Sequence, residues 1–203
     1  MVVALVVSIG WVVSELTSVS SHFLGSIASP QLRSGVSMAS ESTMQPTVLV
    51  VDFGAQYAQL IARRVREAQV YSEIVPHRIT AQEVRQRKPI GIILSGGPAS
   101  VHVEGAPLLD PEIYELGIPI LGICYGCQLI AQQLGGEVAR GGRGEYGRTT
   151  LQRIAGSTSQ LHHDSIPAQL SVWMSHFDAV SVLPSGFVAT ASTPDAPMAV
   201  IES

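Results

Sequence analysis

From residue 47 onward, short apolar runs alternate with segments of helical periodicity, and this pattern constrains the fold more than any other feature. The first run, residues 48–53, is mostly apolar and stops at Gly54, as expected for a strand that is buried on both faces. The next segment, residues 55–68, has apolar side chains three and four positions apart, which predicts an amphipathic helix. Strands that alternate with helices in this way predict a parallel sheet.

The same alternation continues along the chain. A short helix is expected over residues 80–87, where Thr80 is the N-cap and Glu83 completes a capping box. Beyond residue 145 the helical pattern fades, and short antiparallel strands are expected instead. The other expected elements are parallel strands at 70–75, 89–95 and 118–123, a helix that includes 128–134, and antiparallel strands at 149–154, 170–174, 179–183, 188–191 and 198–201. The fold class is therefore α/β, a doubly wound, mostly parallel sheet with antiparallel strands in its C-terminal part.

The N-terminal segment has a different character. Residues 1–13 are almost entirely apolar but too few to span a membrane, which takes about 20 residues. Residues 14–47 are rich in serine, with glycine and proline, and this composition predicts a disordered linker. We interpret residues 1–45 as a disordered extension or the product of a misassigned start, with Met38 and Met44 as alternative starts. An export signal is the other interpretation, although no basic residue precedes the apolar stretch.

Charge and cysteine content narrow the function classes. The net charge is −4 and only 14% of residues are charged, so no basic face indicates nucleic acid. The two cysteines, Cys124 and Cys127, form neither a disulfide framework nor a zinc motif, and they favour a reducing, cytoplasmic setting. We interpret His162 and His163 as loop surface rather than a metal site, and expect no metal, cofactor or membrane contact in this domain.

The main chemical signal is Gly122-Ile123-Cys124-Tyr125-Gly126, where an expected strand runs into an expected helix. This is the thiol form of the G-x-S-x-G nucleophile elbow, a turn so sharp that Cβ atoms on either side have no room. A thiol at a helix N-terminus also has a lowered pKa, which favours the thiolate. The alternative is that Cys124 is an ordinary buried core cysteine.

A glycine pair supports the first interpretation. Ser95-Gly96-Gly97-Pro98 ends the neighbouring strand, so it meets Cys124 at the carboxyl edge of the sheet, where ligands of such folds bind. The backbone N–H groups of Gly97 and Tyr125 could together form an oxyanion hole for a tetrahedral acyl intermediate. An ordinary tight turn is the alternative for the glycine pair.

Four blocks of sequence resemble the class I (triad-type) glutamine amidotransferase family, in the form found in GMP synthases. They are V-V-D-F-G-A-Q-Y at 50–57, I-L-S-G-G-P at 93–98, G-I-C-Y-G-C-Q at 122–128 and V-W-M-S-H at 172–176. The first and last blocks differ from those of anthranilate and carbamoyl-phosphate synthase amidotransferases. The resemblance covers residues 46–203 and implies a flavodoxin-like amidotransferase domain.

The resemblance implies a role for each matched residue. Cys124 would attack the side-chain amide of glutamine, form a glutamyl thioester and release ammonia. The backbone N–H groups of Gly97 and Tyr125 would bind the oxyanion. The implied glutamine-binding residues are Gln128, Ser175, His176 and Phe177.

The resemblance also implies a partner. In the family, ammonia passes to an ATP-pyrophosphatase (synthetase) domain or subunit, where ATP and Mg adenylate XMP and the ammonia converts it to GMP, a step of purine biosynthesis. The S-G-G-V-D-S loop of that domain does not occur in these 203 residues. ATP and Mg are therefore expected in the synthetase domain rather than in this one.

The sequence departs from the family at three points. The catalytic His and Glu of the family lie in a His-Pro-Glu motif that these 203 residues do not contain, so we expect a domain incomplete at its C-terminus and weakly active or inactive. His176 is interpreted as structural or substrate-side, because the family has a histidine there besides its catalytic one. Phe177 replaces a family glycine and could narrow the pocket or force a different φ. Cys127 replaces methionine or another apolar residue and is expected to face the helix interior.

Two other functions stay open. The missing His-Pro-Glu motif favours a non-catalytic, glutamine-binding or regulatory module that keeps the fold. Another α/β thiol enzyme, such as a peptidase-like protein, is the second alternative, but Gln128 and the W-M-S-H block argue against it.

Overall fold

The computed structural model describes residues 2–5, 45–54, 56–159, 161 and 166–203, and the account below concerns those residues. The helical elements are α2 (Tyr57–Glu67), α3 (Ala81–Arg87), the 3-10 helix η2 (Pro111–Leu116) and α4 (Tyr125–Gln133). The strands are β1 (Val2–Leu5), β2 (Thr47–Asp52), β3 (Tyr71–Pro76), β4 (Gly91–Leu94), β5 (Ile120–Ile123), β6 (Glu137–Arg153), β7 (Gln169–Val182), β8 (Val188–Ser192) and β9 (Val200–Glu202). None of these helices is long and apolar enough to cross a membrane.

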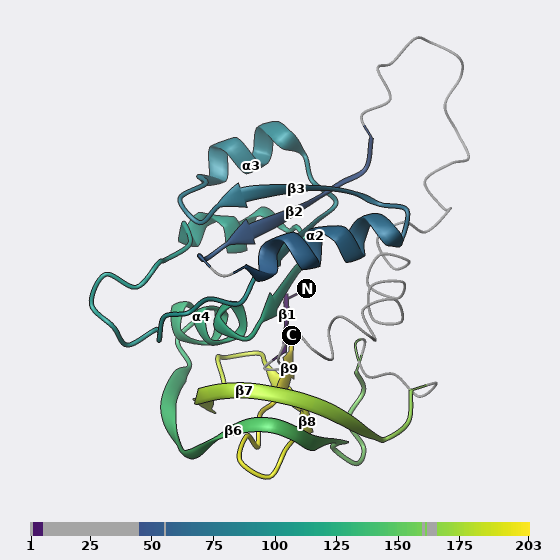
Figure 1. The fold of residues 1–203 in the computed structure, drawn as a ribbon. Coiled ribbons are helices and arrows are strands. Elements are labelled where there is room, and N and C mark those ends of the chain that lie inside the picture. Colours follow the sequence, from purple (N-terminus) through teal and green to yellow (C-terminus); the bar gives the residue numbers. More distant parts are fainter. Residues whose placement is uncertain (1, 6–44, 55, 160, 162–165) are drawn as a thin grey trace.

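The described strands form one sheet in the order β3-β2-β4-β5-β1-β9-β8-β6-β7. The first five are parallel, and β9, β8, β6 and β7 are antiparallel to their neighbours, so the predicted fold class is confirmed (Figure 1). Strands β2, β4 and β5 have runs of fully buried residues because helices or other strands cover both of their faces.

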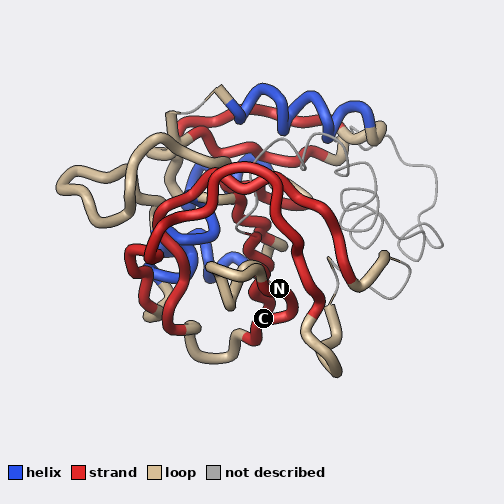
Figure 2. Tube along the Cα trace, turned by 60° about the horizontal axis from the view of Figure 1, so that its bottom comes forward, coloured by secondary structure: helices blue, strands red, loops and turns tan. Residues whose placement is uncertain are grey.

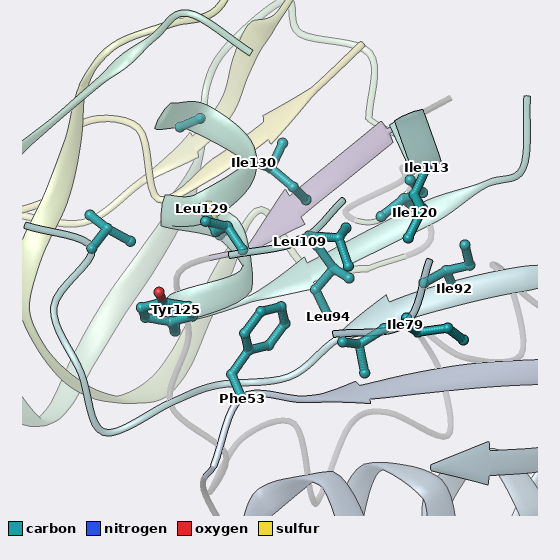
Figure 3. Packing of buried hydrophobic residues seen from close by; sticks show 14 of the residues in the cluster. Phe53, Ile79, Ile92, Leu94, Leu109, Ile113, Ile120, Tyr125, Leu129 and Ile130 are labelled. Carbon is teal, nitrogen blue, oxygen red and sulfur yellow. The ribbon is translucent and has the colours of Figure 1, made fainter. Parts of the chain in front are cut away.

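Each face of the parallel strands has its own apolar core. On one face, α2 packs Ala58, Ile61 and Val65 against Val50 and its neighbours. On the other face, α3, η2 and α4 cover the alternate residues of the same strands. Figure 3 shows this second core, in which Ile113 of η2 lies beside Ile120 of β5, while Leu129 and Ile130 of α4 belong to the same cluster. Each such buried side chain contributes about 1.5–3 kcal/mol, so α4 is held firmly where the chemistry is expected.

The antiparallel part differs from the prediction in two respects, of which the first concerns β7. Residues 170–174 and 179–183 were expected to be separate strands, but they form the single strand β7. The alternation of exposed and buried side chains continues through Ser175, His176, Phe177 and Asp178, with His176 opposite Glu145 of β6. Figure 2 shows β6 and β7 side by side as a long, arched ribbon. The hydrophobic pattern did not predict a strand here because most residues at these positions are polar.

Strand β6 also begins at Glu137 rather than at residue 149. Its early part is rich in glycine, which favoured a loop in the sequence interpretation. The strand pairs with β7 on both sides of a register shift between Arg140 and Glu145, so the irregular stretch is a bulge within the ladder.

The prediction that residues 1–45 form a disordered extension is wrong for Val2–Leu5. These residues form β1, which lies between β5, its parallel neighbour, and β9, its antiparallel neighbour. In that position the backbone N–H and C=O groups of these residues can form hydrogen bonds with a neighbouring strand on each side. Residues 6–44 of the predicted extension lie outside the described residues. In Figure 1 the two ends of the chain lie close together at this point of the sheet.

The local signals in the N-terminal half are confirmed. Helix α3 begins after Thr80, whose side chain accepts from the backbone of Glu83, while the Glu83 carboxylate accepts from the backbone of Thr80. The 3-10 helix η2 was not predicted. It begins after Asp110, whose carboxylate accepts from the backbone N–H of Glu112.

Candidate functional site

Cys124 lies in a sharp turn between β5 and α4. Its backbone has φ 52° and ψ −108°, and it is one of three described non-glycine residues with a positive φ. Such a conformation costs on the order of 1–3 kcal/mol and persists only where the surrounding structure imposes it. The elbow geometry predicted from the sequence is therefore present.

Both flanking glycines are required by close backbone contacts. A Cβ atom on Gly122 would lie 2.7 Å from the carbonyl oxygen of Gly126 and 2.8 Å from the backbone nitrogen of Cys127. A Cβ atom on Gly126 would lie 2.5 Å from the carbonyl oxygen of Leu94. Because neither contact can be relieved by rotating a side chain, the predicted need for glycine on both sides of Cys124 is confirmed.

These contacts also bring the glycine pair to the cysteine. The N–H of Gly126 donates to the carbonyl oxygen of Ser95 at 3.2 Å, which joins the start of α4 to the end of β4. A Cβ atom on Gly97 would lie 3.2 Å from Cγ of Tyr125 and 3.2 Å from the carbonyl oxygen of Phe53. The centroids of the Phe53 and Tyr125 rings are 5.3 Å apart. Figure 3 shows the two rings as neighbours in the core.

A cavity of about 410 Å³ opens beside Cys124. Its wall includes every residue that the sequence singled out for the site: Gly97, Cys124, Tyr125, Gln128, Ser175, His176 and Phe177. They come from the turn after β4, from the elbow and α4, and from the middle of β7. The structure thus places them together at the carboxyl edge of the parallel strands, where α/β folds bind ligands.

The pKa of the Cys124 thiol differs in direction from the sequence prediction. Burial raises this pKa above its ordinary value, while the backbone N–H of Tyr125 lowers it by a smaller amount. The prediction of a lowered pKa is therefore wrong, because loss of solvent outweighs the favourable helix start. Cys127 is fully buried against the core of α4, as expected, and burial raises its pKa as well.

His176 belongs to a buried polar cluster rather than facing the thiol alone. Its Nε2 lies 3.1 Å from Oε2 of Glu145, and its Nδ1 lies 3.1 Å from the carbonyl oxygen of Asp178. A carboxylate and a carbonyl group both accept, so each ring nitrogen is already engaged. His176 can take a proton from Cys124 only if one of these contacts breaks.

The structure adds Asp178 to the candidate site. This residue lines the cavity, is 7% exposed, and its carboxylate accepts a hydrogen bond from Ser100 Oγ. Its carbonyl oxygen accepts from Nε2 of Gln128 at 2.8 Å. The amide nitrogen of Gln128, a residue expected to bind substrate, is therefore already engaged in a hydrogen bond within the protein. Asp178 follows His176 by two positions, and strand alternation would have placed both side chains on one face, had this stretch been predicted as a strand.

Phe177 lies at the rim of the cavity and is 41% exposed. It is not among the described residues with positive φ, so its backbone lies in the region that side chains ordinarily adopt, and a φ different from that of the family glycine stays a prediction. Its ring packs over Gly144, where an added Cβ atom would lie 3.1 Å from Cδ2 of Phe177. The side chain therefore borders the opening, and narrowing of the pocket stays a prediction.

Comparison with known proteins decides the family. The model for "Glutamine amidotransferase class-I" matches residues 49–203. This chain belongs to the class I glutamine amidotransferase family. The amidotransferase is also similar to a solved structure, a putative GMP synthase subunit from Thermoplasma acidophilum, with a TM-score of 0.65, 29% identity and 76% of each chain covered.

The amidotransferase resembles curated relatives over only part of their length. It is 59% identical over 167 residues to the glutamine-hydrolyzing GMP synthase of Thermobifida fusca, covering 82% of this chain and 31% of that protein. It is 58% identical over 156 residues to the protein of the same name from Mycobacterium tuberculosis H37Rv, covering 77% of this chain and 29% of that protein. The amidotransferase therefore spans about a third of the length of these relatives.

Proposed function

We propose that this amidotransferase provides the glutamine-hydrolysing site of a GMP synthase. The observation that carries the proposal is the meeting, in one cavity, of a strained cysteine elbow and the Gly96–Gly97 turn. Packed backbone on both sides fixes the two elements relative to each other. A preorganised nucleophile facing backbone donors is suited to acyl transfer.

The reaction would proceed in two steps. Sγ of Cys124 forms a bond to the amide carbon of the glutamine side chain, and the developing oxyanion accepts from the backbone N–H groups of Gly97 and Tyr125. The carbon–nitrogen bond then breaks, the thiol proton ends on the leaving nitrogen, and ammonia departs from a glutamyl thioester. Water adds to the thioester, the carbon–sulfur bond breaks, and the thiol regains a proton as glutamate leaves.

The wall of the cavity that β7 forms would hold the amino-acid end of glutamine. The Asp178 carboxylate is buried, and the described salt bridges pair it with no lysine or arginine, so it suits the α-ammonium group of a substrate. Ser175 and Phe177 lie along the same strand at the opening. The substrate-binding roles expected for Gln128, Ser175, His176 and Phe177 belong to this proposal.

The described residues alone would turn over glutamine slowly. Among the described residues that line the cavity, one is a histidine, His176, and both of its ring nitrogens are engaged. The raised pKa of Cys124 further lowers the fraction of thiolate at neutral pH. We therefore propose that full activity needs the base and carboxylate of the family's His-Pro-Glu motif.

The same proposal gives the ammonia a destination. The relatives are named glutamine-hydrolyzing GMP synthases, which supports a synthetase domain or subunit as the partner that uses the ammonia. From the family resemblance, we expect ATP and Mg to bind in that partner and XMP to be converted there to GMP. The free thiols support a cytoplasmic location. These statements concern a whole protein about three times as long as the matched region.

Active-site labelling tests the proposed nucleophile. A diazo-ketone analogue of glutamine should modify Cys124, and peptide mapping should locate the adduct there. The Cys124→Ala variant should lose the adduct, while the matched Cys127→Ala variant should keep it. An adduct on Cys127, or no adduct in the unaltered protein, would count against the proposal.

A non-catalytic glutamine-binding module is the second candidate, favoured by the engaged His176 ring. Calorimetric binding of glutamine without release of ammonia would support it. Addition of a chain segment that carries His-Pro-Glu would then decide: appearance of glutaminase activity favours the enzyme, and continued binding without turnover favours the module.

A further inference from the structure

Glu145 is a buried carboxylate behind the cavity wall. It is 6% exposed and lies in β6 opposite His176. Its carboxylate accepts from Thr193 Oγ1 at 2.6 Å, contacts His176 Nε2 at 3.1 Å and lies 3.4 Å from the backbone nitrogen of Asp195. These donors come from β7 and from the turn between β8 and β9. A buried charge is costly unless it is well bonded, so this cluster fixes three segments of chain relative to one another.

The cluster continues to the nucleophile through one carbonyl group. The carbonyl oxygen of Asp178 contacts His176 Nδ1 at 3.1 Å and accepts from Gln128 Nε2 at 2.8 Å. Gln128 lies in α4, the helix that begins directly after Cys124. The backbone of Asp178 is thus held from one side by the nucleophile's helix and from the other by the His176 ring.

The orientation of that ring depends on Glu145. Nε2 of the ring contacts the Glu145 carboxylate and Nδ1 contacts the carbonyl oxygen of Asp178, so the ring is held between two oxygen acceptors. Without the carboxylate, the ring loses its contact at Nε2, and its contact with Asp178 is no longer enforced. The Asp178 carboxylate, which faces the cavity, would then lose its fixed position.

We propose that Glu145 is a positioning residue of the acyl-donor site: through His176 it sets the place of Asp178, and so the alignment of the substrate with Cys124. This inference rests on the proposed glutaminase function. It assigns Glu145 no contact with substrate, because Glu145 is not among the residues that line the cavity.

The turn between β8 and β9 has a part in this arrangement. Thr193 donates to Glu145 through Oγ1, and the same oxygen accepts from the backbone N–H of Ala196 at 3.0 Å. The backbone N–H of Thr193 donates to the carbonyl oxygen of Ala196 at 2.9 Å. This compact turn holds the hydroxyl toward Glu145. Loss of the hydroxyl should therefore disturb the position of Asp178 less than loss of the Glu145 carboxylate does.

The test compares two reactions of the same thiol in the full chain. The diazo-ketone analogue of glutamine needs the acyl-donor site, whereas iodoacetamide needs only access to Cys124. In Glu145→Gln, the half-saturating concentration of the analogue should rise about ten-fold or more, with little change in the maximal rate, as expected for a lost charged hydrogen bond. Iodoacetamide labelling should stay within two-fold of the unaltered protein. Thr193→Val should give a smaller rise, and the matched control Thr149→Val, whose hydroxyl lies 3.5 Å from Glu145, should give almost none.

Amide hydrogen exchange provides a readout that needs no glutamine analogue. Glu145→Gln should speed exchange over residues 175–178 and leave residues 48–51 of β2 unchanged. Unchanged analogue binding, or equal slowing of both labelling reactions, would overturn the inference. If the unaltered protein does not react with the analogue, the proposed function fails, and the exchange comparison still decides the role of Glu145. Should Glu145→Gln not fold, Thr193→Val carries the same comparison.

Discussion

The tightest backbone contact of the site yields a quantitative prediction for Gly126→Ala. The new Cβ atom would lie 2.5 Å from the carbonyl oxygen, 2.7 Å from Cβ and 2.9 Å from the carbonyl carbon of Leu94. Since real Cβ atoms stay at least 3.0 Å from such neighbours, α4 and β4 must separate by about 0.5 Å. The separation would move Cys124 away from the Gly96–Gly97 turn.

The size of the effect follows from that forced movement. Overpacking a well-packed site costs about 1–3 kcal/mol, and the upper part of this range applies because all three contacts involve fixed atoms. Helix propensity returns up to about 1 kcal/mol, since alanine is favoured over glycine within α4. A net loss of about 2 kcal/mol should lower Tm by about 4–8 °C for a chain of this size.

Thermal unfolding and iodoacetamide labelling of Cys124 together check this prediction. The matched control is Gly105→Ala, where no atom lies within 4 Å of the added Cβ but φ is 76°. The control should lose about 1–2 kcal/mol from backbone strain alone and label at the normal rate. The reasoning would be refuted if Gly126→Ala unfolded at the same temperature as the unaltered protein and labelled equally fast.

Four more outcomes are expected. Because burial raises the pKa of Cys124 and Cys127, folding favours the neutral thiols. The stability from this effect is fully present below their ordinary value of 9.0 and should fall progressively as the pH rises above it. Urea titrations should not find this loss in a variant with alanine at both positions. Ala4→Pro should lower the free energy of unfolding by about 1–3 kcal/mol, since Ala4 pairs with both Gly122 and Ile201 and proline cannot donate; an unchanged Tm would contradict the pairing of β1. Thr80→Ala should cost about 1 kcal/mol through loss of the helix cap, while Glu83→Gln, which can still complete a capping box, should cost less in the same denaturant titration. Phe177→Gly should open the cavity rim and lower the half-saturating concentration of the glutamine analogue, and a higher value would show that the ring aids binding.

The parallel part of the fold could be predicted because its signals are local. The apolar run around Val50 and the capping box at Thr80 each specify an element within a few residues. The elbow at Cys124 was predictable for the same reason, since glycine on both sides of a cysteine between a strand and a helix has a direct steric cause. Close packing of neighbouring strand ends then brings Gly97 to the same edge.

The errors concern interactions between distant segments. The stretch Ser175–Asp178 looks polar in isolation, and only its pairing with β6 makes it a strand and places Asp178 in the cavity. The pKa of Cys124 depends on how much protein surrounds the thiol, which a motif does not reveal. The position of β1 depends on two strand edges more than one hundred residues away in sequence.

The position of β1 has a consequence for how the chain reaches its final form during synthesis. Val2–Leu5 are synthesised long before their neighbours in the sheet, Ile120–Ile123 and Val200–Glu202. Closing so long a loop is entropically costly and such contacts tend to form late. Until residue 202 has been synthesised, this apolar segment lacks its second neighbouring strand, and exposed apolar segments of that kind are bound by chaperones.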